Sequence, residues 1–190
     1  MIRAFATLAP ALLLVALANC GAAHHESGQS NEGATVDNAT LTKFTLTSDS
    51  FQNGDAMPAQ YTCDGANQAP ALHWSDPPPG TKSFALVVDD PDAPSGIFRH
   101  WGVIDIPASA RSIGGGQSAG TEVRNDFGKA GYGAPCPPKG HRPHHYYFKL
   151  FALDIEKLRL SADSKVADVE DAARQHAIGE GQLIGTYERK

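Results

Sequence analysis

Basic residues are too few and too scattered in this sequence to suggest a nucleic-acid partner. There are 16 lysines and arginines against 21 aspartates and glutamates, and the formal net charge is −5. No block of basic residues is present, and no aromatic residues alternate with basic ones. Nucleic-acid-binding proteins usually carry a clustered basic surface. We therefore expect no nucleic-acid partner, and an anionic ligand must be recognised by a local site.

Long hydrophobic runs are also absent, apart from one near the N-terminus. It extends from Ala4 to Ala18, directly after Arg3, and is too short to span a bilayer stably. A cation followed by a short apolar run is typical of an export signal. We predict that residues 1–19 are a signal peptide and that the protein is exported to the periplasm.

The end of this run resembles the lipobox of bacterial lipoproteins, because Leu17 precedes Cys20 by three positions. The resemblance implies lipidation of Cys20 and attachment to the periplasmic face of a bacterial membrane. Asn19 departs from the small residue that is usual there, so cleavage by an ordinary signal peptidase, giving a soluble periplasmic protein, stays an alternative. Residues 20–41 lack apolar periodicity and are predicted to be a flexible tether before one domain at 42–190.

Cysteine is scarce, with three residues in the chain. Apart from Cys20, Cys63 and Cys136 remain, and an oxidising compartment favours their pairing. Such a bond closes a loop of about 73 residues and contributes about 4 kcal/mol in the chain-entropy model. The alternative is two free thiols that pack as small apolar groups.

The remaining apolar residues occur in short runs bounded by Gly, Pro, Asn and Asp, which is typical of antiparallel β proteins. One helix is predicted, with Ser164 as N-cap and Gly179 beyond its end. We predict a mainly β fold of two antiparallel sheets, sandwich-like, with a peripheral C-terminal helix and a final strand; a general α+β fold is the alternative. The predicted strands cover residues 44–47, 72–74, 83–88, 100–106, 146–153 and 182–187.

Several polar residues stand at the ends of predicted strands, where they can meet at one rim. Asp90 and Asp92 alternate with prolines, which restrict the backbone before binding. His100 begins one strand, and His144 with Tyr146 begins another. Imidazole and phenol groups donate hydrogen bonds to anions, and a nearby aspartate orients an imidazole. The Gly-rich stretch 114–140 is long for a connection and is expected to border this site.

Five ordered motifs resemble those of the phosphatidylethanolamine-binding proteins, in particular the bacterial branch called Raf-kinase-inhibitor-like. They cover residues 90–94, 100–101, 125–128, 132–138 and 144–146. The resemblance implies a non-catalytic pocket without a cofactor that accepts phosphate groups or phospholipid head groups. Its matching residues are Asp90, Asp92, His100, Pro137, His144 and Tyr146.

Three residues depart from the family pattern: Asp105, where Asn is common, Ala134, where Gly is usual, and His145, where relatives often carry Arg. The last change replaces a permanent cation by a group that titrates near neutral pH. We therefore expect that His145 weakens anion binding and makes it depend on pH.

The main alternative function also comes from the resemblance, which implies that such proteins can act as inhibitors: a protein inhibitor of a kinase or protease that acts through the same pocket. In either case the protein is expected to be a monomer. Residues 116–120 match G-x-S-x-G, which makes a serine hydrolase using Ser118 a remote alternative, although the strand and helix that this motif requires are not predicted. His141, His144, His145 and Asp90 lack a recognised metal-ligand spacing, so no metal site is expected.

Overall fold

The computed structural model describes residues 41–190. The predicted signal peptide, the lipidation site Cys20 and nearly all of the predicted tether lie outside these residues. The described residues form one compact unit. No helix in the described part is both long and apolar enough to cross a membrane.

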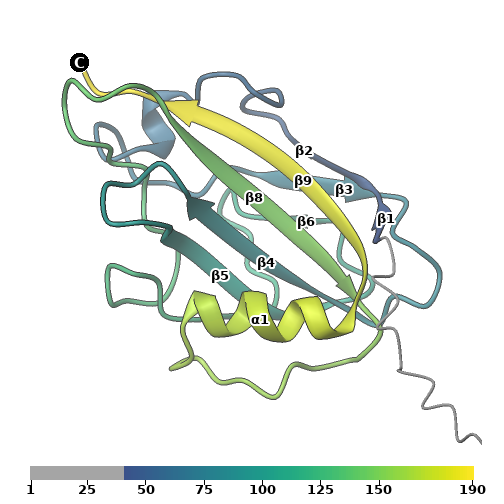
Figure 1. The fold of residues 1–190 in the computed structure, drawn as a ribbon. Helices are drawn as coiled ribbons and strands as arrows, with labels where there is room; N and C mark the ends of the chain where they lie inside the picture. The colour runs from purple at the N-terminus through teal and green to yellow at the C-terminus, as the bar shows by residue number, and fades with distance from the viewer. Residues whose placement is uncertain (1–40) are drawn as a thin grey trace, which may run out of the picture. The chain divides into compact units, whose positions relative to one another are not determined.

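A six-stranded sheet is the centre of this unit (Figure 1). Its neighbouring strands are antiparallel, except that the short β1 runs parallel to β9. In spatial order the strands are β1 (Thr42–Lys43), β9 (Ala177–Tyr187), β8 (His144–Leu153), β4 (Ser83–Asp90), β5 (Phe98–Pro107) and β7 (Thr121–Glu122).

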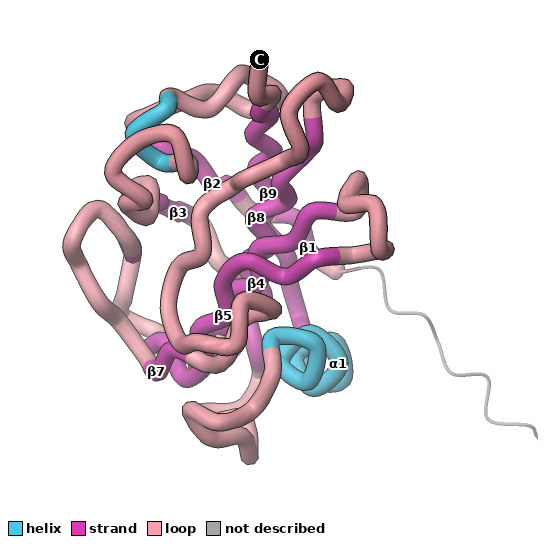
Figure 2. The backbone as a smooth tube through the Cα atoms, turned by 90° about the vertical axis from the view of Figure 1, so that its left-hand side faces the viewer, coloured by secondary structure: helices cyan, strands magenta, loops and turns pink. Residues whose placement is uncertain are grey.

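Two layers cover the opposite faces of this sheet, as Figure 2 shows. On one side lies a three-stranded sheet of β2 (Thr45–Ser48), β3 (Leu72–Ser75) and β6 (Ser112–Ile113). On the other side lies α1 (Val166–His176). A single 3-10 turn, η1 (Ala59–Tyr61), precedes β3. The predicted mainly β fold with a C-terminal helix and a final strand is confirmed.

Coverage on both sides explains why β4 is a nearly continuous apolar run. All eight of its residues are buried. Phe84, Leu86 and Val88 belong to the core between the two sheets, whereas Ala85 and Val87 belong to the core beneath α1. A strand in the middle layer must supply apolar side chains to both faces.

The helix differs from its prediction at both ends. Lys165, not Ser164, is the N-cap residue, and its backbone N–H donates to the Asp168 carboxylate at 2.8 Å. Gly179 does not terminate the helix, because the chain enters β9 directly at Ala177. Val166, Val169 and Ala173 are buried against the sheet, as the predicted apolar face requires.

Strands β4, β5, β8 and β9 are longer than predicted: polar residues extend β4 and β8, and β9 begins at Ala177, directly after α1. Strand β5 contains an irregularity at Asp105, where the pairing with β4 shifts register and φ is 56°. Asn and Asp tolerate this left-handed conformation better than most residues. The Asp105 carboxylate also accepts a hydrogen bond from the Leu158 N–H at 2.9 Å, so it ties β5 to the segment before α1.

Candidate functional site

A cavity of about 210 Å³ opens where β4 ends and where β5 and β8 begin. The ends of these three adjacent strands meet at one rim of the sheet. The Gly-rich stretch 114–140 contributes the remaining wall, as expected. The lining residues are Asp90, Ala93, Pro94, Ser95, Phe98, His100, Phe127, Cys136, Pro137, Pro138 and His144.

Asp90 and His144 form a buried pair at this cavity. The His144 Nδ1–H donates to Asp90 Oδ2 at 2.7 Å, and the side chains are 2% and 4% exposed. The other carboxylate oxygen of Asp90 accepts the backbone N–H of Asp92 at 2.8 Å. Because Nδ1 of His144 is occupied, the Nε2 atom remains as the ring nitrogen for a ligand.

His100 reaches the cavity through an irregularity in β5. The pairing of β4 with β5 shifts register between Val88 and Asp89, so that His100 lies in a β-bulge between Arg99 and Trp101. Bulges redirect side chains and are common beside functional sites. The His100 Nδ1–H donates to the Gly133 carbonyl at 2.7 Å, which again leaves Nε2 unused. Burial lowers the pKa of His100, against the opposing effect of the Gly133 carbonyl and Asp90.

Two phenylalanines form an apolar rim that the sequence reasoning did not assign to the site. The rings of Phe98 and Phe127 lie 4.8 Å apart, and both pack against His100. Phe127 is 47% exposed although it is a large hydrophobic residue. Asn125 holds its turn, because the Asn125 side chain accepts the Phe127 N–H and donates to the Gly131 carbonyl. Phe127 lies in the motif 125–128, which resembles the family. Its place in that motif was the sequence signal that could have assigned it to the site.

A disulfide pins the wall that contains Pro137. It joins Cys63 and Cys136, whose Cα atoms are 5.3 Å apart. The Cys63 N–H also donates to the Pro135 carbonyl at 3.0 Å. The long irregular stretch therefore has a covalent attachment next to the cavity, as the sequence predicted.

Asp92 does not line the cavity, although the sequence reasoning placed it there. One of its oxygens accepts from Arg142 Nη2 at 2.7 Å, and the other accepts the backbone and ring N–H groups of His145 at 3.0 and 2.7 Å. The hydrogen bond from the His145 side chain is the main cause that lowers the pKa of Asp92. Asp92 thus holds His145 and Arg142 in place beside the site.

Tyr146 lies behind His100 and is also not part of the cavity lining. It is fully buried, and its ring packs edge-on against the His100 imidazole at a centroid distance of 5.2 Å. Its hydroxyl has no hydrogen-bond partner in residues 41–190. Burial is the main cause that raises the pKa of Tyr146, and the Asp90 carboxylate adds to it. Of the six predicted residues, the cavity brings together Asp90, His100, Pro137 and His144.

The structural context of Ser118 is not that of a hydrolase nucleophile. Ser118 is exposed and follows a turn in which Gly114 and Gln117 pair. The next element is the short strand β7 and not a helix, and no histidine lines the separate cavity that Ser118 borders. Among residues 41–190, no group of three or more His, Cys, Asp or Glu residues is arranged to hold a metal ion.

The model of the family described as phosphatidylethanolamine-binding protein matches residues 47–188. This match covers most of the chain, including the strands from β3 to β9, the helix and the cavity. The chain belongs to this family.

Similar proteins come from several organisms. A UPF0098 protein of Aquifex aeolicus is 46% identical over 146 residues, which are 74% of this chain and 85% of the relative. A Mycobacterium tuberculosis protein whose name describes it as a candidate lipoprotein, LppC, is 39% identical over 186 residues, 93% of this chain and 92% of the relative. The crystal structure of Escherichia coli YbcL, described as a member of the mammalian PEBP family, superposes with a TM-score of 0.73 and 37% identity. That match covers 77% of this chain and 99% of the solved chain.

Proposed function

We propose that the domain binds a small anionic ligand, a phosphate group or the head group of a phospholipid, in the cavity formed by Asp90, His100, Pro137 and His144. The observation that carries this proposal is the pair of buried imidazoles whose Nδ1 atoms are already bonded to protein oxygens. Two Nε2 atoms are thereby left for one ligand. The family to which the chain belongs is described as binding phosphatidylethanolamine, which contains a phosphate group.

The protonation of these imidazoles decides what they can bind. A neutral imidazole that donates through Nδ1 has only a lone pair at Nε2, so it does not attract an anion. A protonated imidazole donates at both nitrogens and carries a charge. In that form His144 keeps the hydrogen bond from Nδ1 to Asp90 and has a second N–H, on Nε2, for the ligand. Anion binding should therefore be accompanied by proton uptake.

The geometry favours binding over catalysis. Asp90 borders the cavity, whereas Asp92 is occupied by Arg142 and His145 outside it. The two carboxylates therefore do not flank one ligand from opposite sides, as acid and base in bond cleavage would. We propose that no residue of the cavity acts as a nucleophile.

A titration with defined anions tests this proposal. The test protein is the chain from residue 20 onward with Cys20→Ser, which removes the predicted lipid. Phosphate, phosphoethanolamine and acetate are added while histidine and backbone NMR signals are followed. We expect saturable shifts at Asp90, His100 and His144 with the two phosphate ligands.

Matched variants locate the binding. His144→Gln keeps an amide that can donate to Asp90 but removes the titrating ring, and we expect at least tenfold weaker phosphate binding. His145→Gln is the control, because His145 lies next in sequence but pairs with Asp92 outside the cavity. Equal losses in both variants, or shifts that appear elsewhere, would contradict the assigned site.

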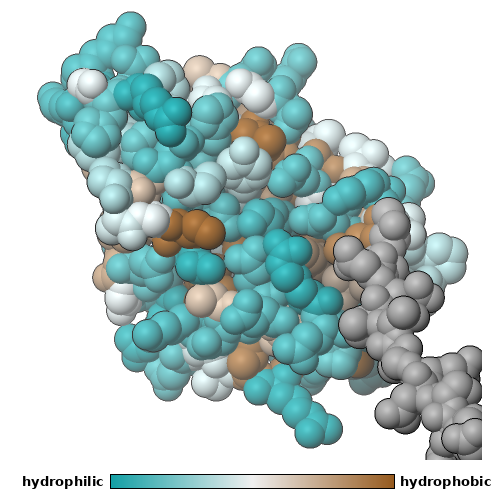
Figure 3. Space-filling view, viewed as in Figure 1, coloured by the Kyte–Doolittle hydropathy of each residue, from teal (hydrophilic) through white to brown (hydrophobic). Residues whose placement is uncertain are grey.

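A protein inhibitor of a kinase or protease is the second candidate, and one observation favours it. Ile97 and Phe127, at 52% and 47% exposure, are the large hydrophobic residues most exposed in the described part, and Phe127 lines the cavity. However, on the face that Figure 3 draws, hydrophobic residues form small separate areas, not one broad patch. If no small anion gives a saturable shift at millimolar concentration, this candidate becomes the leading one.

We propose further that the mature domain, residues 42–190, is a monomer tethered by residues 20–41 to a lipid on Cys20 at the periplasmic face of a membrane. The match to LppC extends over 93% of this chain, so it includes part of the region before the domain. Metabolic labelling with a fatty acid tests this proposal. We expect label in the wild type and none in Cys20→Ser; an unlabelled wild type would favour the soluble periplasmic form.

A further inference from the structure

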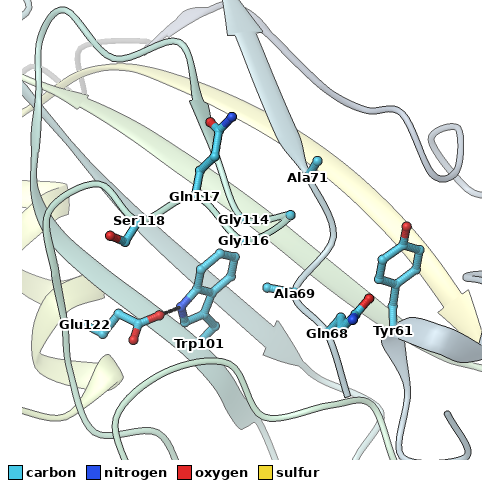
Figure 4. A pocket seen from close by; sticks show the side chains of 11 residues that line it. Tyr61, Gln68, Ala69, Ala71, Trp101, Gly114, Gly116, Gln117, Ser118 and Glu122 are labelled. Atoms are coloured by element: carbon cyan, nitrogen blue, oxygen red, sulfur yellow. Dashed lines mark hydrogen bonds between the residues drawn. The ribbon is translucent and has the colours of Figure 1, made fainter. Parts of the chain in front are cut away.

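A second cavity, of about 510 Å³, lies apart from the anion site and shares no lining residue with it. Figure 4 shows Trp101 at its centre, with Glu122, Ser118 and Gln117 on one side and Gln68 and Tyr61 on the other. Its wall is formed by the turn from Gly114 to Ser118 and by the segment before β3. Ligand cavities in proteins typically have volumes of about 300 to 1,000 Å³, so this one is large enough for a small molecule.

The walls of this cavity are held together by specific contacts. The Gly115 N–H donates to the Ala69 carbonyl at 3.1 Å, which fastens the turn to the opposite wall. Gly115 has a φ of 58°, and a Cβ atom there would lie 2.9 Å from the Ala71 Cβ. A glycine is thus required for this close approach. On the inner side, Trp101 packs against Tyr132, whose hydroxyl donates to the Tyr61 carbonyl at 2.8 Å.

Hydrogen bonds also orient the polar groups of the cavity. The Trp101 Nε1–H donates to Glu122 Oε1 at 3.0 Å, a bond drawn as a dashed line in Figure 4. The Ser112 hydroxyl donates to Gln117 Oε1 at 2.8 Å. The groups left over on this side of the cavity are therefore an acceptor, Glu122 Oε2, and a donor, the Gln117 amide NH₂, and the Gln68 amide on the other side can donate and accept. The Ser118 hydroxyl, which can do both, is exposed beside them.

The charge of the cavity excludes some ligand classes. No Lys, Arg or His is among its lining residues, and no cation of residues 41–190 forms a salt bridge with Glu122. An anion would be repelled by the Glu122 carboxylate and would find no positive charge. An ammonium group would be attracted by Glu122, but it only donates and so offers no acceptor to the Gln117 NH₂.

We propose that this cavity binds a small neutral polyol, such as a cyclic polyol or a monosaccharide. Each hydroxyl of such a ligand both donates and accepts, so adjacent hydroxyls match the acceptor of Glu122 and the donor of Gln117. The apolar ring carbons would lie against the wall of glycines and alanines, where Trp101, at 2% exposure, contributes a small surface. The site is separate from the anion cavity and would give the protein a second ligand class.

The tryptophan indole signals give a direct test, because the chain has two tryptophans. Both are buried in the core, at 2% exposure for Trp101 and 4% for Trp74, but only Trp101 lines the cavity, and the Trp74 Nε1 atom has no partner in the described structure. The chain from residue 20 with Cys20→Ser is titrated with myo-inositol and glucose, and the two indole N–H signals are followed by NMR. The solved E. coli relative consists almost wholly of the matched domain, which supports the use of this form.

We expect the Trp101 signal to shift saturably, with millimolar affinity, and the Trp74 signal to stay in place. Glu122→Gln keeps an acceptor for Trp101 and should weaken the affinity about tenfold, since a charged hydrogen bond becomes a neutral one. Glu156→Gln, a change of an exposed carboxylate outside the cavity, is the control and should have no effect.

Ser118→Phe should fill the cavity and abolish the shift, whereas Ser118→Ala should leave it largely intact. A wild-type Trp101 signal that does not move at tens of millimolar polyol would overturn the proposal. A shift with ethanolamine but not with either polyol would overturn it as well. Loss of the phosphate response at His100 and His144 would bear only on the anion site.

Discussion

Asp89 and Asp90 are neighbours at the end of β4, and both are buried, yet they belong to different parts of the molecule. Asp89 lies on the α1 side, where Lys149 Nζ donates to it at 2.6 Å and to Glu170 at 3.0 Å. Asp90 lies on the cavity side and pairs with His144. Adjacent strand residues point to opposite faces of a sheet, so one dipeptide serves both faces.

The difference lies in how completely each carboxylate is neutralised. Glu170 also accepts from Arg174 at 2.8 Å, so the charges beneath α1 form a closed network. Burial by itself lowers the pKa of Lys149, but Asp89 and Glu170 outweigh it, and the net shift is upward. At Asp90 the partner is an imidazole that can lose its charge, and its Nε2 atom is left unused. The network around Asp89 is suited to stabilising the fold, and the pair of Asp90 and His144 is suited to binding a ligand.

Replacing Lys149 should have the largest effect on stability. Lys149→Met leaves Asp89 without a cation in a buried position, and we expect a loss of about 3 to 5 kcal/mol in the free energy of unfolding. Urea denaturation measures it. Adding Asp89→Asn should restore part of the loss, and phosphate affinity of the folded protein should stay unchanged. A large drop in affinity would show that the two sides are not separate.

His144→Gln should affect phosphate affinity more than stability. We expect phosphate affinity to fall at least tenfold, while the free energy of unfolding falls by about 1 to 3 kcal/mol, because an amide can still donate to Asp90. Calorimetric titration and urea denaturation measure the two quantities. Unchanged affinity would remove His144 from the proposed site.

Acidification should act on the cavity in two opposite ways. Because burial lowers the pKa of His100 in the folded protein, the unfolded chain binds this proton more readily. The neutral His100 therefore makes its full contribution to the free energy of unfolding above the ordinary histidine pKa of about 6.5. This contribution is lost as the pH falls below that value. Anion affinity should instead rise on acidification, since the protonated ring donates from Nε2.

Sulfate is a suitable probe between about pH 5.5 and 8, because it keeps its charge where histidine titrates. We expect stronger sulfate binding at the acidic end, a weaker dependence in His100→Gln, and an unchanged one in His145→Gln. A dependence that disappears only in His145→Gln would support the expectation drawn from the sequence that His145 controls it. A flat profile in the wild type would contradict both.

Arg142→Ala should have the smallest effect. Arg142 is 76% exposed, and surface ion pairs of this kind contribute about 0 to 1 kcal/mol. We expect unchanged phosphate affinity and a change in unfolding free energy within this range, measured by urea denaturation. A strong loss of affinity would show that the group around Asp92 takes part in binding after all.

Much of the fold could be predicted because its signals are local. The apolar runs of β4, β5, β8 and β9 and the apolar face of α1 follow from residue spacing. Their ends could not be predicted well, because polar residues such as Asp90 and His144 continue strands only when neighbouring strands supply hydrogen bonds. The junction of α1 with β9 without a loop likewise depends on how Ala177 and Leu153 pair.

Sequence reasoning was least informative about the direction of side chains. Asp90 and Asp92 stand in one rigid motif, but only Asp90 borders the cavity. The bulge that redirects His100 leaves no clear mark in the chain, and the role of Phe127 follows from the turn made by Asn125. Tyr146 was expected to contact the ligand, but the structure places it behind His100.

By itself the sequence determined the mainly β class, the family, and the set of chemical groups available to the site, because these follow from periodicity and from ordered motifs. The tertiary structure alone decided which of those groups share a cavity, which carboxylate is neutralised by a lysine, and that a second cavity forms around Trp101. These outcomes depend on strand register and on contacts between segments far apart in the chain. A shift of one residue in register would turn each strand's side chains to the opposite face.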